Sequence, residues 1–176
     1  MTAQFIVEDG SVVANANALV SVADADQIME NFGASTDWSG AVQAVKEAAI
    51  REATRFLDIN YVWAGYKVDE DQTCQWPRYD MYDEDGYTVD FDIVHRLVKE
   101  ACAYLALQVV EGDTLLEDFE NKSKVKKTKD VIGPLTEERE YVVGETPEKT
   151  YTVVEKLITP FIINGSTFNS TSLERS

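Results

Sequence analysis

The tripeptide Trp76-Pro77-Arg78 combines the side chains in this sequence that are best suited to molecular recognition. Pro77 fixes its own backbone angle and restricts Trp76 to an extended conformation, so the indole and the guanidinium project in a predetermined arrangement. An indole provides a large apolar anchor, and a guanidinium binds a carboxylate or a phosphate through two hydrogen bonds. Two interpretations are equally supported: the tripeptide lies at an interface, or Trp76 fills the core while Arg78 neutralises nearby carboxylates.

A second candidate for recognition is a lysine segment, residues 122–129, which holds five lysines and no carboxylate. On an acidic chain, such a segment favours electrostatic docking on a like subunit or on another partner. An edge strand protected from aggregation by lysines explains the composition equally well. The lysines are Lys122, Lys124, Lys126, Lys127 and Lys129.

Carboxylates are concentrated between residues 69 and 92, where nine of them accompany a single arginine, for a net charge of −8. Placing Gly86 at the sixth position of a calcium-binding EF-hand loop puts Met81 at the first position, and a thioether does not bind a hard cation. We therefore expect no metal site but a solvated acidic loop with a turn at Asp85-Gly86. Weak cation binding by residues 80–92 stays open.

Motifs of common enzyme classes are absent from the sequence: a glycine-rich phosphate loop, a Gly-x-Ser-x-Gly turn and the zinc sequence His-Glu-x-x-His. His95 is the single histidine, and near a predicted helix start it is expected to cap or pack rather than to catalyse. Cys74 and Cys102 have no metal-binding or redox spacing, so we expect both to be reduced. The chain is therefore predicted not to be an enzyme and to use no cofactor.

Length and composition indicate one globular domain. The 176 residues suffice to bury a core, and 44% of them are hydrophobic. The net charge of −16 opposes binding to the phosphate backbone of nucleic acid. No apolar run reaches the roughly 18 residues that span a bilayer, and the N-terminus lacks a signal-peptide pattern, so we expect a soluble cytoplasmic product.

Apolar periodicity predicts the helices that would position these residues. The first begins after Ser21, which forms a capping box with Asp24, and ends at Gly33. The second covers residues 39–58 and has two apolar faces, which require burial by another helix or by another subunit. The third covers residues 95–111 and is predicted to be the central core helix.

The remaining segments are predicted to be a loop, a hairpin and a short helix. Residues 61–92 show no period and form a long structured loop, a kind of loop that usually serves function. Residues 122–143 form a hairpin or two extended arms around Gly133-Pro134, a short helix follows at 152–162, and residues 164–176 form a flexible tail. The predicted fold class is mainly α: a bundle of about four helices in one domain, residues 1–163, with a long loop and a C-terminal hairpin or arm.

Several short motifs, in their order and spacing, resemble the head-tail connector or adaptor proteins of tailed phages, a family often labelled DnaT-like single-stranded-DNA-binding proteins. The resemblance covers about residues 5–163. The chain departs from the family at His95 and Thr152, where members often have proline, and this bears on helix boundaries rather than on membership. The motifs are VEDGS (7–11), VSVADAD (20–26), KEAAIREATRFLD (46–58), WPR (76–78), DG (85–86), VKEA (98–101), LAL (105–107), GD (112–113) and GP (133–134).

This resemblance implies a virion protein of the neck, made in the host cytoplasm and without contact with a membrane. Several copies, commonly twelve, would form a ring that binds the portal protein, extends the DNA channel and provides the attachment site for a tail-side neck or tail protein. Genomic double-stranded DNA would pass through without sequence-specific binding. The DnaT-like label implies instead a single-stranded-DNA binder, which needs a basic groove with aromatic platforms. Because the lysine segment contains no aromatic residue, the adaptor is favoured.

We therefore expect two kinds of contact. Trp76 is expected to anchor the long loop against the helical core, while Arg78 pairs with carboxylates of the same or the adjacent subunit. The lysine segment is expected to dock on an acidic partner surface. The full set of expected subunit or partner contacts is Trp76, Arg78, Lys122, Lys124, Lys126, Lys127, Lys129, Tyr151 and Phe161.

Overall fold

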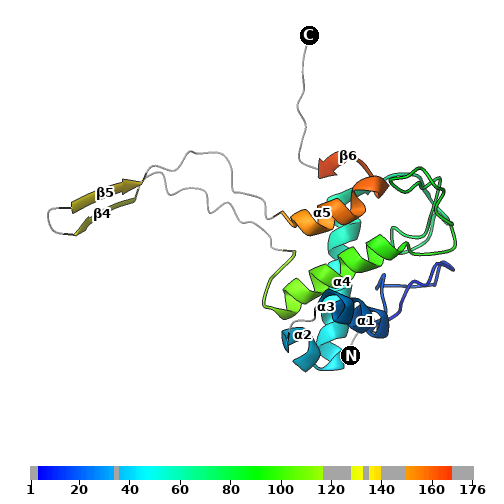
Figure 1. The fold of residues 1–176 in the computed structure, drawn as a ribbon, viewed down its shortest axis with the longest axis horizontal. Coiled ribbons are helices and arrows are strands. Elements are labelled where there is room, and N and C mark those ends of the chain that lie inside the picture. Colours follow the sequence, from blue (N-terminus) through cyan, green and yellow to red (C-terminus); the bar gives the residue numbers. More distant parts are fainter. Residues whose placement is uncertain (1–3, 34–35, 117–127, 133–134, 140–149, 168–176) are drawn as a thin grey trace, which may run out of the picture. The chain divides into compact units, whose positions relative to one another are not determined.

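The computed structural model describes residues 4–33, 36–116, 128–132, 135–139 and 150–167, and it is mainly α-helical (Figure 1). This confirms the predicted fold class. The strands of the described residues pair only in twos. The elements are α1 (Val22–Phe32), α2 (Thr36–Gly40), α3 (Gln43–Asn60), β1 (Tyr61–Trp63), β2 (Tyr66–Lys67), β3 (Arg78–Tyr79), α4 (Arg96–Val110), β4 (Thr128–Ile132), β5 (Leu135–Arg139), α5 (Thr152–Ile158), a 3₁₀ helix (Thr159–Phe161) and β6 (Ile162–Thr167).

The chain divides into two compact units. The first unit, Met1–Leu116 with Thr152–Ser176, contains the helical bundle and the long loop. The second unit, Glu117–Tyr151, contains β4 and β5, which pair antiparallel with Thr128 opposite Arg139 and Ile132 opposite Leu135. The predicted hairpin is confirmed for these two strands. The rest of the predicted hairpin, 122–127, 133–134 and 140–143, lies outside the described residues.

Helix α1 has the boundaries that its capping residues predict. The backbone N of Asp24 donates a hydrogen bond to Ser21 Oγ at 3.0 Å, which satisfies one free N–H of the first turn. Gly33 ends the helix in the left-handed conformation, with φ at 78°, which costs glycine little. Ala25 and Met29 bury the inner face of the helix.

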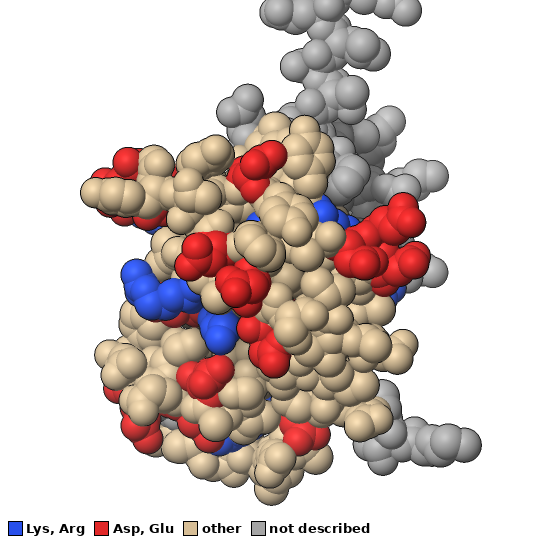
Figure 2. All heavy atoms as spheres, turned by 90° about the vertical axis from the view of Figure 1, so that its right-hand side faces the viewer, with Lys and Arg blue, Asp and Glu red and all other residues tan. Residues whose placement is uncertain are grey.

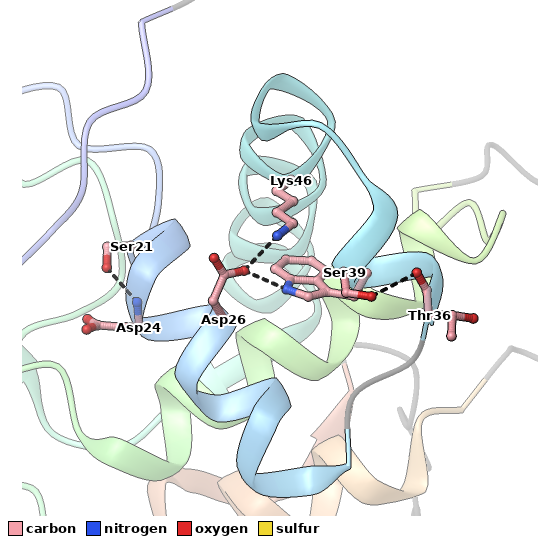
Figure 3. Close-up of polar contacts among 7 residues, drawn as sticks. Ser21, Asp24, Asp26, Thr36, Ser39 and Lys46 are labelled. Carbon is pink, nitrogen blue, oxygen red and sulfur yellow. Dashed lines mark hydrogen bonds and ion pairs between the residues drawn. The ribbon is translucent and has the colours of Figure 1, made fainter.

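The helix predicted at 39–58 is in fact two helices, α2 and α3. Val42 is the N-cap of α3 and has an extended backbone, with ψ at 153°. Trp38 of α2 is buried, and its Nε1 donates a hydrogen bond to Asp26 Oδ1 at 2.8 Å. Lys46 Nζ pairs with the same oxygen at 2.8 Å and lies 5.3 Å from the centre of the Trp38 ring (Figure 3). Through these contacts α2 and α3 are each held on Asp26 of α1.

The first of the two apolar faces predicted for this segment is buried over most of its length, by Ala49, Ala53 and Phe56 of α3. The same face is exposed at its N-terminal end, where Val42 is 66% exposed and Val45 is 46% exposed. On the neighbouring face of small residues, Ala44 and Ala48 are exposed as well. Burial of these exposed positions by another subunit stays a prediction.

Helix α4 is the central core helix, as predicted, because it packs against α1, α2, α3 and α5. His95 is its N-cap, and His95 Nδ1 accepts a hydrogen bond from Leu97 N at 3.2 Å. The predicted helix-start role of this histidine is therefore confirmed. The buried residues of α4 are Val98, Ala101, Cys102, Ala103, Leu105 and Ala106.

The C-terminal part of the first unit folds back on the end of α3. Helix α5 ends at Ile158, and a 3₁₀ turn with Pro160 at its start leads into β6. Strand β6 pairs antiparallel with β1, with Trp63 opposite Ile162 and Tyr61 opposite Thr167. The prediction of a flexible tail from residue 164 is therefore wrong for residues 164–167, because backbone hydrogen bonds to β1 hold them in a strand. Across the described ranges, no helix has the length and apolar character needed to cross a membrane.

Candidate functional site

The long loop between α3 and α4, residues 61–95, contains most of the residues singled out in the sequence. It lies at one end of the bundle beside the N-terminal segment (Figure 1). Thr73 Oγ1 donates a hydrogen bond to the carbonyl of Ala16 at 2.7 Å, and Gly10 packs against the backbone of Asp92. The prediction of one long structured loop is confirmed, although the loop also contains the short strands β1, β2 and β3.

Trp76 anchors this loop in the core. Its side chain is fully buried, and its ring meets Trp63 edge-on at 5.7 Å and Phe161 edge-on at 5.5 Å between ring centroids. Phe161 in turn contacts the ring of His95 at 4.7 Å. The Trp76-Pro77 peptide bond is cis. The expected packing of Trp76 against the helical core is confirmed within one copy of the chain.

Arg78 holds the loop through backbone carbonyls. Its Nε donates to Ala64 O at 2.6 Å, Nη2 donates to Gly65 O at 3.0 Å and more weakly to Trp63 O at 3.4 Å, and Nη1 donates to Gln75 O and Gln75 Oε1, both at 3.1 Å. These contacts use the five N–H donors of the guanidinium. Among the described residues Arg78 forms no ion pair with a carboxylate. The predicted pairing is therefore not formed with carboxylates of the same subunit, because carbonyl oxygens surround the guanidinium. Pairing with the adjacent subunit stays a prediction.

Two further polar side chains, Gln72 and Asp58, support the same loop. Gln72 is buried, and its Nε2 donates to Cys74 O at 2.9 Å and to Pro77 O at 3.0 Å. Asp58 of α3 accepts a hydrogen bond from Gln75 N at 3.2 Å. Burial raises the pKa of Asp58 to about 7, although the Gln75 hydrogen bond and the charges of Lys67 and Arg78 act in the opposite direction. Asp58 ends the motif KEAAIREATRFLD, although its role in holding the loop was not predicted, and Gln72 lies in no motif of the sequence.

The VEDGS motif explains how the N-terminal segment joins the loop. Glu8 is buried, and its carboxylate accepts hydrogen bonds from the backbone N of Gly10, Val12 and Val13 at 2.9 to 3.0 Å. Gly10 has φ at 110°, and a Cβ there would lie 1.9 Å from Asp92 O. The motif therefore requires glycine at this position for backbone conformation and for close contact with the loop.

The outer side of the loop carries an exposed set of aromatic rings that the sequence analysis missed. Tyr66 lies opposite Tyr79 in the β2–β3 pair, and the rings of Tyr79 and Phe91 are 4.8 Å apart. Tyr82 pairs with Thr88, and Tyr87 N donates to Asp83 Oδ1 at 2.8 Å, so residues 82–88 form a tight turn. The exposed fractions are 70% for Tyr66, 41% for Tyr79, 53% for Tyr82, 72% for Tyr87 and 50% for Phe91.

Carboxylates lie between these rings in the sequence and are exposed with them. Figure 2 views the molecule from the side on which the loop lies, and it shows carboxylates spread among uncharged side chains with few cations. We call this the acidic aromatic surface and define it by the five rings above with the exposed residues Asp80, Glu84, Asp85, Asp90 and Asp92. The alternation of Tyr and Phe with Asp and Glu from residue 79 to 92 was the signal that could have predicted it.

The predicted contact residues fall into two groups. Trp76, Arg78, Tyr151 and Phe161 are each at most 7% exposed within one copy of the chain, so they pack in its interior. Contact of these four residues with another subunit or a partner stays a prediction. Lys129 lies in β4, while Lys122, Lys124, Lys126 and Lys127 lie outside the described residues. Docking through the lysines therefore stays a prediction.

The structure also bears on the predictions about cysteine and metal. Cys74 and Cys102, which were expected to be reduced, are both free and both buried, and burial raises the pKa of each thiol to about 12. The described residues contain no group of three or more His, Cys, Asp or Glu side chains that could hold a metal ion. Met81, at the first position of the tested calcium loop, is buried, while Asp83 accepts hydrogen bonds from the turn backbone.

Comparison with protein-family models matches residues 3–176 to the family described as "Putative DnaT-like ssDNA binding protein". The chain belongs to this DnaT-like family. Comparisons with curated proteins and with solved structures found no match. Membership in the DnaT-like family confirms the family label noted in the sequence analysis. Its description agrees with the alternative function considered there, single-stranded-DNA binding, rather than with the phage adaptor.

Proposed function

We propose that this DnaT-like chain is a non-enzymatic structural subunit of the neck of a tailed phage. In this proposal several copies form a ring that binds the portal protein, extends the DNA channel and provides the attachment site for the tail. The proposal is supported by the order and spacing of motifs over residues 5–163 and by the exposed apolar residues Val42 and Val45 at the N-terminal end of α3.

The observation that carries the proposal is the composition of the acidic aromatic surface. Its five exposed rings offer apolar area of the kind that is enriched in protein interfaces. Its carboxylates repel phosphate, and the nearest cations of the loop are engaged, because Arg78 is buried and Lys67 Nζ donates to Gln72 O at 3.1 Å. Such a surface suits contact with another protein beside a channel through which DNA must slide without being held.

Co-sedimentation with rings of the cognate portal protein tests this proposal. We expect the chain to sediment with the portal in a fixed multiple, which would also give the copy number. The matched control is the portal with an unrelated protein of similar mass and charge. Failure of the chain to sediment with the portal at any stoichiometry would reject the adaptor.

Single-stranded-DNA binding is the second candidate, and the family description favours it. Exposed tyrosines can stack on bases, and the lysine segment could neutralise phosphates. The carboxylates between the tyrosines oppose this arrangement, since a stacked base brings its phosphates close to them. Fluorescence anisotropy of a labelled oligonucleotide, measured at several salt concentrations, decides between the two functions. Binding that weakens steeply with salt and is lost in a Tyr82→Ser, Tyr87→Ser variant would establish the DNA binder.

A further inference from the structure

We propose that the acidic aromatic surface of one copy binds the lysine segment, residues 122–129, of a second copy. This inference rests on the proposed function, because it specifies one contact between neighbouring subunits of a ring. The surface and the segment are the most concentrated opposite charges of the chain.

The acidic aromatic surface is rigidly presented, so it can bind with little loss of conformational freedom. Trp76 and Arg78 fix the base of the loop, as described above. The turn at 82–88 is closed by hydrogen bonds from Asp83 N to Tyr87 O at 3.0 Å and from Val89 N to Met81 O at 2.9 Å. Met81 and Val89 point inward and are buried, which leaves Tyr82, Tyr87 and the neighbouring carboxylates on the outside.

Charge complementarity identifies the occupant. Residues 122–129 carry five positive charges without a carboxylate, while residues 69–92 carry nine carboxylates and one arginine, and that arginine is buried. Lysine ammonium groups interact favourably both with carboxylates and with the faces of tyrosine rings. A polyanion such as DNA matches the lysine segment but not the acidic aromatic surface, whereas the lysine segment of another copy satisfies both.

The contact is heterologous, because the surface and the segment are different parts of the chain. Each copy therefore gives one segment and receives one, and a contact of this kind generates a closed ring when its rotation closes. Because both sides are charged, the association is expected to weaken as salt rises.

A peptide titration tests the inference without the portal. The probe is a synthetic peptide of residues 121–129, added to isotope-labelled full-length protein in which Lys124, Lys126 and Lys127 are changed to Ser, so that its own segment does not compete. We expect NMR shifts concentrated at residues 79–91, and we expect a Glu84→Gln, Asp90→Asn change to weaken binding at least fivefold. Glu30→Gln with Glu111→Gln is the matched control, since it removes two exposed carboxylates elsewhere and should leave binding unchanged.

Three outcomes would overturn the inference. The first is an absence of shifts at residues 79–91, and the second is equal binding by a peptide whose lysines are replaced by serine. The third is found with the wild-type chain alone: NMR shifts at residues 79–91 that do not change with protein concentration. Such shifts would mean that each copy binds its own lysine segment, whereas binding between copies requires shifts that grow with concentration. Peptide failure with intact portal binding rejects this contact alone, while peptide binding without portal binding rejects the adaptor and keeps the contact between copies.

Discussion

The indole of Trp76 meets the ring of Phe161 edge-on, with centroids 5.5 Å apart and ring planes at 85°. Trp76 belongs to the long loop, and Phe161 ends the 3₁₀ turn that precedes β6. Two segments that are 85 residues apart in the chain therefore share one part of the core. The loop is built into the bundle at this contact, and its outer side is free to meet a partner.

Trp76→Ala should destabilise the protein by about 3 to 5 kcal/mol, the usual cost of removing a large buried aromatic side chain. Chemical denaturation measures this free energy of unfolding. Trp76→Phe is the matched control and should cost clearly less, because it keeps a ring against Trp63 and Phe161 and removes an indole N–H that has no hydrogen-bond partner among the described residues. Equal stability of wild type and Trp76→Ala would show that the indole does not anchor the loop.

Arg78→Lys should cost at least about 2 kcal/mol even though the charge is kept. A lysine ammonium has three donors on a flexible stem and cannot reach the carbonyls of Ala64, Gly65 and Gln75 together, so buried acceptors lose their partners. Arg96→Lys is the control, because Arg96 is exposed and pairs with Glu100 on the helix surface, where an ion pair contributes little. A similar small effect of both changes would contradict the role of Arg78.

Asp58 should make stability depend on pH. Its pKa is about 7 in the folded protein, against 3.8 for an unperturbed aspartate carboxyl, so the folded state binds the proton more tightly. This tighter proton binding stabilises the folded state fully below about pH 4. As the pH rises to about 7 the stabilisation is lost, and the free energy of unfolding falls by up to roughly 4 kcal/mol in total.

The Asp58→Asn variant keeps an acceptor for Gln75 N but does not titrate. Its free energy of unfolding, measured from pH 4 to pH 8, should lack this fall, so that the variant gains stability relative to wild type as pH rises. Glu30→Gln, on the exposed surface, should change nothing in this range. If the free energies of unfolding of Asp58→Asn and wild type differ by the same amount across the whole range, the pKa of Asp58 is not raised by burial in the folded protein.

Gly10→Ala should destabilise the protein more than Gly86→Ala does. Both glycines have positive φ, at 110° and 83°, so both changes strain the backbone by about 1 to 2 kcal/mol. At Gly86 nothing lies within 4 Å of the added Cβ, whereas at Gly10 the Cβ would lie 1.9 Å from Asp92 O and would push the N-terminal segment away from the loop. Thermal unfolding of the two variants compares them directly, and equal shifts would argue against this packing.

The helices could be predicted from the sequence because their signals are local. Ser21, Asp24 and Gly33 mark the two ends of α1, and the apolar spacing of residues 95–111 marks α4. The break before α3 was not predicted, and the contacts that hold α2 and α3 on Asp26 join residues 12 and 20 positions apart in the chain. Periodicity cannot report a contact of this kind.

The candidate site was harder to predict, because burial decides the role of each residue. Trp76 and Arg78 have the composition of an interface, yet the carbonyls of residues 63–65 and the ring of Phe161 place both inside. The exposure of Tyr82 and Tyr87 was not predicted. Both rings lie on the outside because Met81 and Val89 take the inner positions of the same turn. Strand β6 was not predicted either, because it pairs with β1, which lies about 100 residues earlier in the chain.

The central claim is that this DnaT-like chain acts in the neck through protein contacts and not through DNA. The most direct measurement is analytical ultracentrifugation of the purified chain mixed with cognate portal rings and a fluorescent single-stranded oligonucleotide, at near-physiological salt. The account predicts that the chain moves with the portal in a fixed multiple while the oligonucleotide stays free. Co-sedimentation of the chain with the oligonucleotide, and none with the portal, would contradict the account and establish the DNA-binding function of the family description.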